Sequence, residues 1–277
     1  MPAPRLLTRS AVVDRLRAAG CVYAEDEAEL LLAGATTPGA LTTMLDQRVA
    51  GLPLEHVLGW VEFFGRRWVV DPGVFVPRRR TELLVRQAAA LAAPGSVVVD
   101  LCCGSGAVGA ALATVVARAQ VHASDVDPAA VRCARANLLG VKGRVYQGDL
   151  YEPLPAALRG RVDILLANAP YVPTGSIALM PPEARLHEPA VALDGGADGL
   201  DVQRRVIAEA PQWLAPGGHL LVETGRHQAA RTAEAFFHNG LHPQVTRCDE
   251  LDATVAYGTS PASRRSHRLR PRGGRPG

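Results

Sequence analysis

From residue 96 onward, short apolar runs alternate with longer segments whose apolar residues recur at helical spacing. Five runs predict strands: SVVVDL, QVHASDVD, GRVYQGDL, RVDILLANAPY and GGHLLVETG. The segments AVGAALATVVARA, PAAVRCARANLLG and DVQRRVIAEAPQWLA predict helices, and HPQVTRC and ATVAYG predict a strand pair at the end. Strands that alternate with helices in this way predict an α/β fold, a doubly wound and mostly parallel sheet covered on both faces.

The first 80 residues have a different pattern. Two stretches between Thr8 and Ala33 have helical spacing, and a further helix is predicted from Leu41 into QRVAGLPLEHVLG. The segment VEFFGRRWVVDPGVFVPRRR, in which Gly and Asp-Pro-Gly interrupt aromatic and β-branched residues, predicts a β-hairpin. We therefore expect a small helical domain at 1–58, a hairpin linker at 59–80, the α/β domain at 81–259 and a basic, disordered tail at 260–277.

Composition and cysteine pattern narrow the class of protein. The 277 residues are 48% hydrophobic and 21% charged, which is ordinary for a globular protein. No apolar run reaches the roughly 18 residues of a membrane helix, and the N-terminus lacks the apolar core of a signal peptide. The five cysteines are odd in number and form no C-x-x-C pair. These features predict a cytoplasmic protein without a disulfide framework, a zinc site or a membrane anchor.

The charge is unevenly distributed along the chain. The net charge is +3, but the last 18 residues contain six arginines and no acid, which leaves −3 for residues 1–259. The body is therefore not a basic nucleic-acid-binding surface. For the tail, contact with RNA or ribosomes is an alternative to a solvated segment. We expect a monomer.

A glycine-rich loop follows the first strand of the α/β region. CGSGAVG contains G-x-G-x-x-G at Gly104, Gly106 and Gly109. Alone this pattern is weak evidence for a dinucleotide, because small residues also serve to pack a helix against a sheet. Asp100 lies just before the glycines, and a pyrophosphate requires a site poor in carboxylates. The loop therefore favours a ligand without phosphate over NAD.

Polar side chains end four successive predicted strands: Asp100, Asp125, Asp149 and Asn168. In open α/β sheets, ligands bind at the carboxyl ends of the strands. S-adenosylmethionine (SAM) has a sulfonium, an ammonium, ribose hydroxyls and an adenine amine, all of which suit carboxylates. We expect Asp125 to accept both ribose hydroxyls and Asp149 the adenine amine, with Leu150 packing on the ring. Each of these residues alone could be a cap or turn residue, but the three acids and Asn168 in register favour a SAM site without metal.

From about Asp26 to Gly258, the chain resembles the protein-(glutamine-N5) methyltransferases that modify peptide-chain release factors, the HemK/PrmC family. GLPLEHVLGWVEFFGRRWVVDPGVFVPRRRTELLV resembles the interdomain hairpin of the family, and VVDLCCGSGAVGAALA resembles its SAM loop. LLANAPYVP stands where the family has Asn-Pro-Pro-Tyr, a motif whose Asn-x-Pro-Tyr core is shared with nucleic-acid amino-methylases. EPAVALDGGADGLD, followed by GGHLLVETGRHQ, is the more specific part of the resemblance.

The resemblance implies a class I SAM-dependent methyltransferase with a Rossmann-like sheet. It implies methylation of the N5 amide nitrogen of a glutamine in a protein such as a release factor, with S-adenosylhomocysteine as product. The implied cofactor residues are Asp100, Cys102, Cys103, Gly104, Gly106, Asp125, Val126, Asp149, Leu150 and Asn168. The implied catalytic residues are Asn168, Ala169, Pro170 and Tyr171, and those on the substrate side are Arg78, Glu82 and Glu188. For Glu188, a loop salt bridge is the alternative.

The chain departs from the family pattern in several places. Ala169 replaces a proline, and PRRRTE replaces Pro-Arg-Pro-Glu-Thr-Glu in its middle. The N-terminal domain is about one helix shorter than is usual in the family, where that domain contacts the release factor. Cys102 and Cys103 stand in the first two positions of the Gly-x-Gly-x-Gly loop. We expect these cysteines to be tolerated if their backbones avoid positive φ.

The residue types of the Asn-Ala-Pro-Tyr segment suit methyl transfer to a planar NH2 group. An amide nitrogen is a poor nucleophile, so the chemistry depends on orientation and electrostatics and not on a strong base. The side-chain oxygen of Asn168 and the carbonyl of residue 169 can accept the two amide hydrogens, without the cost of burying a carboxylate. Pro170 favours an extended Ala169, and Tyr171 offers a flat wall. The alternative is that Asn168 only caps a turn.

Two other functions remain open at the level of sequence. One is methylation of an amino group on a small metabolite or a nucleic-acid base. The other is a SAM-binding paralogue that has lost catalysis and serves as an interaction module.

Overall fold

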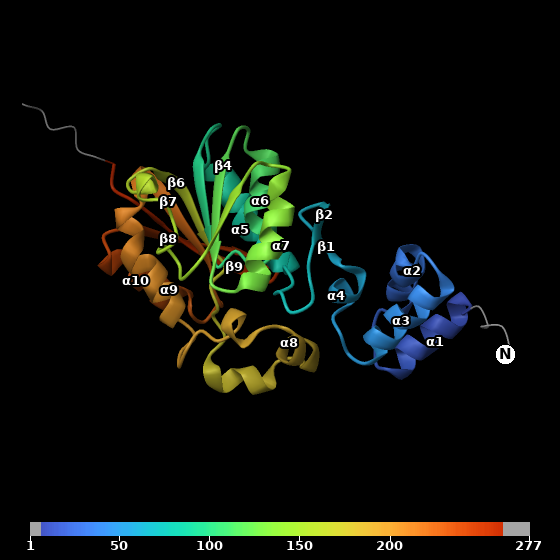
Figure 1. The fold of residues 1–277 in the computed structure, drawn as a ribbon. Coiled ribbons are helices and arrows are strands. Elements are labelled where there is room, and N and C mark those ends of the chain that lie inside the picture. Colours follow the sequence, from blue (N-terminus) through green and yellow to red (C-terminus); the bar gives the residue numbers. More distant parts are fainter. Residues whose placement is uncertain (1–6, 263–277) are drawn as a thin grey trace, which may run out of the picture.

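The computed structural model describes residues 7–262, and the rest of the expected tail lies outside the described residues. Four helices come first: α1 (Arg9–Ala18), α2 (Ala24–Gly34), α3 (Pro38–Val49) and α4 (Leu54–Leu58). Helices α1 to α3 lie apart from the sheet, at the right of Figure 1, around a core of their own. The hydroxyls of Thr8 and Thr37 accept N–H bonds at the starts of α1 and α3, as N-caps do.

The single helix predicted from Leu41 through residue 58 is wrong. The structure has two helices, α3 and α4, separated by residues 50–53. Gly51 has a φ of 95°, outside the helical region, and Pro53 cannot donate a helical N–H bond. These two residues end one helix and allow the next to begin in another direction.

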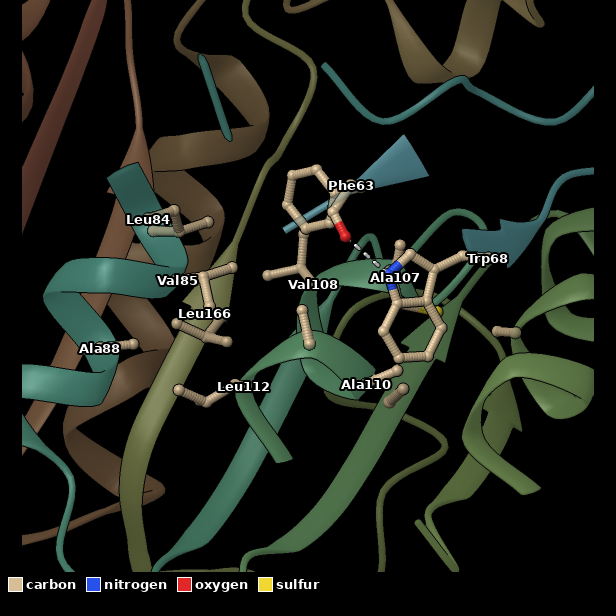
Figure 2. Packing of buried hydrophobic residues seen from close by; sticks show 14 of the residues in the cluster. Phe63, Trp68, Leu84, Val85, Ala88, Ala107, Val108, Ala110, Leu112 and Leu166 are labelled. Carbon is tan, nitrogen blue, oxygen red and sulfur yellow. Dashed lines mark hydrogen bonds between the residues drawn. The ribbon is translucent and has the colours of Figure 1, made fainter. Parts of the chain in front are cut away.

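The predicted hairpin is present and packs on the α/β region. Strands β1 (Trp60–Phe63) and β2 (Arg66–Val69) pair antiparallel, and the two turn residues between them, Phe64 and Gly65, both have positive φ. Trp68 donates its Nε1–H to the carbonyl of Phe63 at 2.9 Å. Figure 2 shows these two side chains against helix α6, among the buried residues of the core.

A seven-stranded sheet forms the centre of the α/β region. Its strands are β3 (Val97–Leu101), β4 (Gln120–Asp125), β5 (Arg144–Gln147), β6 (Val162–Ala167), β7 (Leu214–Glu223), β8 (His242–Cys248) and β9 (Ala253–Thr259). The spatial order is β5-β4-β3-β6-β7-β9-β8, parallel from β5 to β7 and antiparallel at the β9 and β8 edge. The chain winds outward from β3 in one direction through β5 and then returns to β6 on its other side, so the topological switch point lies between β3 and β6.

Helices cover both faces of this sheet, which confirms the predicted doubly wound fold. Helices α5 (Glu82–Leu91), α6 (Ala107–Val115) and α7 (Pro128–Leu139) cover one face, and α9 (Asp201–Glu209) and α10 (Ala229–His238) the other (Figure 1). The short α8 (Pro182–His187) lies in the long segment between β6 and α9. Short 3-10 turns complete the fold: Arg79–Thr81, Ala156–Leu158, Thr174–Leu179, Ala190–Ala192 and Ala210–Gln212. Between residues 7 and 262, no helix combines the length and apolarity that a membrane crossing requires.

Candidate active site

A cavity opens at the carboxyl ends of β3, β4 and β6, beside the switch point. Its lining includes every predicted cofactor residue except Gly106, namely Asp100, Cys102, Cys103, Gly104, Asp125, Val126, Asp149, Leu150 and Asn168. The parallel register explains this convergence, because Asp100 and Leu101 of β3 lie opposite the ends of both β4 and β6. We refer to this space as the cofactor cavity.

The glycine loop is held by carboxylates. The N–H of Gly104 donates to Oδ2 of Asp125 at 2.8 Å, and the N–H of Gly109 donates to Oδ2 of Asp100 at 2.9 Å. Two N–H groups that a phosphate could use, one in the loop and one in the first turn of α6, are therefore occupied, which agrees with a ligand that lacks phosphate. Gly106 serves packing, since a Cβ there would lie 2.9 Å from the Cβ of Ala134 in α7.

The condition under which the loop cysteines were expected to be tolerated, a backbone without positive φ, is not met at Cys102. Its φ is 51°, in the left-handed region, and it follows directly after β3. A residue with a Cβ is strained there by about 1–2 kcal/mol relative to the right-handed region. No local motif in the sequence marks this conformation.

Electrostatics in the cofactor cavity favour a cation. Asp100 is buried, and this burial raises the pKa of its carboxyl to about 7, against the lowering effect of the Gly109 N–H. Burial likewise raises the pKa of Asp125, although backbone N–H groups of Asp127 and Gly104 lower it. A bound sulfonium and ammonium would stabilise the ionised carboxyls. The carboxylates of Asp100 and Asp125, which can accept hydrogen bonds and face a cation, therefore fit SAM.

Asp149 has a partner that sequence reasoning missed. Its Oδ2 accepts from Nη2 of Arg205 at 2.5 Å, and Arg205, from α9, also lines the cofactor cavity. The other carboxylate oxygen, Oδ1, has no hydrogen bond to a described residue and is available to an adenine amine. Leu150 is buried, has a φ of 46°, and accepts the Ser124 hydroxyl at its carbonyl.

A second, smaller cavity adjoins the first, and we refer to it as the acceptor cavity. Asn168, Pro170, Phe75 and Ala192 line both cavities. The acceptor cavity is further lined by Ala169, Tyr171, Arg78, Arg80, Val172, Met180 and Leu193. Phe75, Arg80, Ala192 and Met180 were not among the predicted site residues, although Phe75, Arg80 and Ala192 lie in the segments that carry the family resemblance. Asn168 thus borders both spaces, at the end of β6.

The glycines of the GGADGLD segment have a packing role at the Asn-Ala-Pro-Tyr turn. A Cβ at Gly195 would lie 2.7 Å from the carbonyl oxygen of Pro170, and one at Gly199 would overlap the carbonyl oxygen of Tyr171. Val172 also accepts the N–H of Gly195 at its carbonyl, and its own N–H donates to Leu193, just before this segment. Only glycine allows the two stretches of backbone to approach this closely.

Two predicted substrate-side residues lie outside both cavities. Glu188 is buried; it accepts from Nη2 of Arg78 at 2.5 Å and from the N–H of Val76 at 3.2 Å. It therefore anchors Arg78, as in the salt-bridge alternative. Glu82 accepts from the N–H of Phe64 and from Arg86, and so holds the hairpin turn to α5.

Two solved structures of methyltransferases share this fold. A methyltransferase from Pyrococcus furiosus aligns with a TM-score of 0.53 at 15% identity, over 70% of this chain and 88% of that one. A ribosomal protein L11 methylase from Lactobacillus delbrueckii subsp. bulgaricus aligns with a TM-score of 0.50 at 16% identity, over 70% and 84%. The family model described as "Methyltransferase small domain" matches residues 67–181. These matches show that the chain has the fold of a class I SAM-dependent methyltransferase, and the sequence relatives described next support SAM as its cofactor.

Sequence relatives define the family. The release factor glutamine methyltransferase of Mycolicibacterium smegmatis is 38% identical over 246 residues, 87% of each chain, and that of Moorella thermoacetica is 38% identical over 268 residues. The chain therefore belongs to the release factor glutamine methyltransferase family, which confirms the resemblance. A 4-amino-L-phenylalanine/4-methylamino-L-phenylalanine methyltransferase of Streptomyces pristinaespiralis is 37% identical over 232 residues, 81% of this chain and 78% of that one.

Proposed function

We propose that this protein transfers a methyl group from SAM to the side-chain amide nitrogen of a glutamine in a peptide-chain release factor. The observation that carries the proposal is the position of Asn168, which borders the cofactor cavity and the acceptor cavity at once. The names of its relatives in Mycolicibacterium smegmatis and Moorella thermoacetica support the same substrate.

The cofactor residues bind and orient. Asp125 accepts the ribose hydroxyls, and Oδ1 of Asp149 accepts the adenine amine while Leu150 packs on the ring. Asp100 stabilises the positive charge of the cofactor, because its own burial makes an ionised carboxyl costly until a cation arrives. When bound, SAM supplies an electrophilic methyl group on a sulfonium.

The acceptor residues orient a neutral NH2 group. The side-chain oxygen of Asn168 and the backbone carbonyl of Ala169 accept its two hydrogens, so that the nitrogen lone pair faces the cofactor cavity. Tyr171 limits the rotation of the planar amide. Catalysis of this kind rests on orientation and fixed dipoles and requires neither a strong base nor a metal. As the new C–N bond forms, the methyl–sulfur bond would break and S-adenosylhomocysteine would leave as a neutral thioether. The methylated amide, which is strongly acidic until it loses its surplus proton, would release that proton to water. Among residues 7–262, no group of three or more metal-binding side chains lies together.

The remaining parts of the chain have proposed roles in recognising the protein substrate. The helical domain at 1–58 contacts the release factor, the hairpin at 59–80 joins it to the catalytic domain at 81–259, and the enzyme acts as a cytoplasmic monomer. Arg48 connects the helical domain to the catalytic domain. It pairs with Glu27 inside the helical domain at 2.6 Å and with Glu183 of α8 at 3.4 Å. The segment that contains α8 and the cavity-lining Met180 is thereby held to the helical domain.

Mass spectrometry tests the proposal. A purified release factor is incubated with the protein and SAM carrying a labelled methyl group, and the product is mapped by fragmentation. A single labelled methyl on a glutamine side chain is expected, and Asn168→Ala is expected to slow its appearance about 10²- to 10³-fold. In a parallel reaction, 4-amino-L-phenylalanine serves as the acceptor, because one relative is named for that compound. Transfer to the amino acid without transfer to the release factor would overturn the protein substrate.

A further inference from the structure

Glu223, the last residue of β7, lies behind the wall of the acceptor cavity. Its side chain is 2% exposed, yet it touches two groups that face the cavity. Oε1 accepts the Tyr171 hydroxyl at 2.9 Å and also the Nε–H of Arg80 at 3.1 Å. The second oxygen, Oε2, is buried and has no hydrogen-bond partner among the described residues. One buried oxygen therefore serves two cavity-lining side chains.

The two side chains held by Glu223 form one unit. Tyr171 and Arg80 both line the acceptor cavity, and the Arg80 guanidinium lies 5.6 Å from the centre of the Tyr171 ring. Burial, followed by the nearby Glu223 carboxylate, raises the pKa of Tyr171, so its hydroxyl stays protonated and keeps donating. Without Glu223, the ring and the guanidinium would each lose the acceptor that sets their orientation.

The backbone of Tyr171 is held independently of its side chain. Nε2 of Gln228 donates to the Tyr171 carbonyl at 2.9 Å, and Oε1 of the same glutamine accepts the N–H of Gly225. Gln228 and the glycine contacts thus fix the course of the chain, and Glu223 fixes the ring. This separation matters because Ala169 lacks the rigid ring that proline would bring to the turn.

We propose that Glu223 is a positioning residue for methyl acceptance, which sets the orientation of Tyr171 and Arg80 without touching cofactor or substrate. The inference rests on the proposed function, because that function assigns the substrate amide to the acceptor cavity. Glu223 does not line the cofactor cavity. Its loss is therefore expected to change the kinetics of the acceptor and leave cofactor binding unchanged.

Two substitutions at this position separate orientation from folding. Glu223→Met keeps the length of the side chain and removes both acceptors, and kcat/KM for the release factor is expected to fall about tenfold to hundredfold. Glu223→Gln keeps a carbonyl oxygen that can accept both bonds, and is expected to retain activity within about threefold. SAM affinity is expected to stay within about twofold in both. As a matched control, Asp163→Asn changes a carboxylate that accepts the Val97 N–H at the start of β6.

A double-mutant cycle with Tyr171→Phe tests whether Glu223 acts through the tyrosine. If it does, the losses of Glu223→Met and Tyr171→Phe do not multiply, and the double variant is less than about threefold worse than Glu223→Met. Losses that multiply fully would overturn the proposal. So would a Glu223→Met protein with wild-type kcat/KM, or one whose SAM affinity falls in step with its turnover.

A spectroscopic measurement separates this inference from the proposed function. Fluorotyrosine is placed at position 171, and its fluorine resonance is recorded in the wild type, Glu223→Met and Asp163→Asn proteins. The resonance is expected to shift in Glu223→Met only, whether or not a release factor is methylated. A wild-type protein that methylates no release factor would count against the function alone, whereas an unmoved resonance in Glu223→Met would overturn the positioning role.

Discussion

Replacement of Asp100 by asparagine is expected to remove the pH dependence of cofactor binding between pH 6 and pH 7. Burial raises the pKa of the Asp100 carboxyl to about 7 in the ligand-free protein. A cation in the adjoining cavity favours the ionised form, so binding expels the proton. SAM affinity is therefore expected to fall as the pH drops through 7, because the Asp100 carboxyl then becomes neutral.

The ionised fraction of the Asp100 carboxyl sets how strongly SAM affinity changes with pH. With a pKa of about 7, about a tenth of the Asp100 carboxyls are ionised at pH 6 and about half at pH 7. SAM is therefore expected to bind about fivefold more tightly at pH 7 than at pH 6, with release of about half a proton at pH 7. An α-amino group has a pKa of about 7.7–8.0, so the ammonium of the cofactor remains mostly charged over this range.

Titration calorimetry in two buffers of different ionisation enthalpy measures both the affinity and the number of protons released. The introduced amide would still offer an oxygen to the Gly109 N–H, so the loop is expected to keep its conformation in Asp100→Asn. The variant should bind SAM equally well at both pH values. If the pH dependence persists unchanged in Asp100→Asn, the reasoning is refuted, and Asp125 becomes the titrating group to test.

Three further predictions concern the same two cavities. Asp125→Ala is expected to raise the SAM dissociation constant about 10- to 150-fold in calorimetry, because two hydroxyl contacts are lost, and an unchanged constant would remove Asp125 as the ribose ligand. Asn168→Ala is expected to cut single-turnover methyl transfer about 10²- to 10³-fold with SAM affinity nearly intact; wild-type turnover would contradict the role of Asn168 in orienting the substrate amide. Gly199→Ala is expected to lower both turnover and melting temperature, because its Cβ would overlap the Tyr171 carbonyl. Gly217→Ala is the control, because the φ of Gly217 (79°) is close to that of Gly199 (76°) and no atom lies within 4 Å of the added Cβ. Equal losses of turnover and melting temperature in the two variants would refute the importance of the contact with Tyr171.

The local sequence pattern was sufficient to predict most strands and helices and a SAM site at the strand ends. Apolar runs and helical spacing depend on nearby residues, and they located the strands, the hairpin and most helices. The acids and Asn168 that end successive strands could be assigned to one edge, because parallel strands in a doubly wound sheet place their carboxyl ends together. The prediction of one helix from Leu41 failed because Gly51 and Pro53 break it, and helices α5 and α8 were not predicted. The positive φ of Cys102 was not foreseen either.

Tertiary structure decided which side chains support the site. Arg205 reaches Asp149 from a helix 56 residues further along the chain, and Glu223 reaches Tyr171 across 52 residues. The close approach of Gly199 to the Tyr171 carbonyl is of the same kind. Strand order creates these contacts by placing β7 beside β6 and α9 over that face of the sheet. A one-dimensional pattern carries no information about such pairing, because the contacts form only when distant segments pack against the same strand ends.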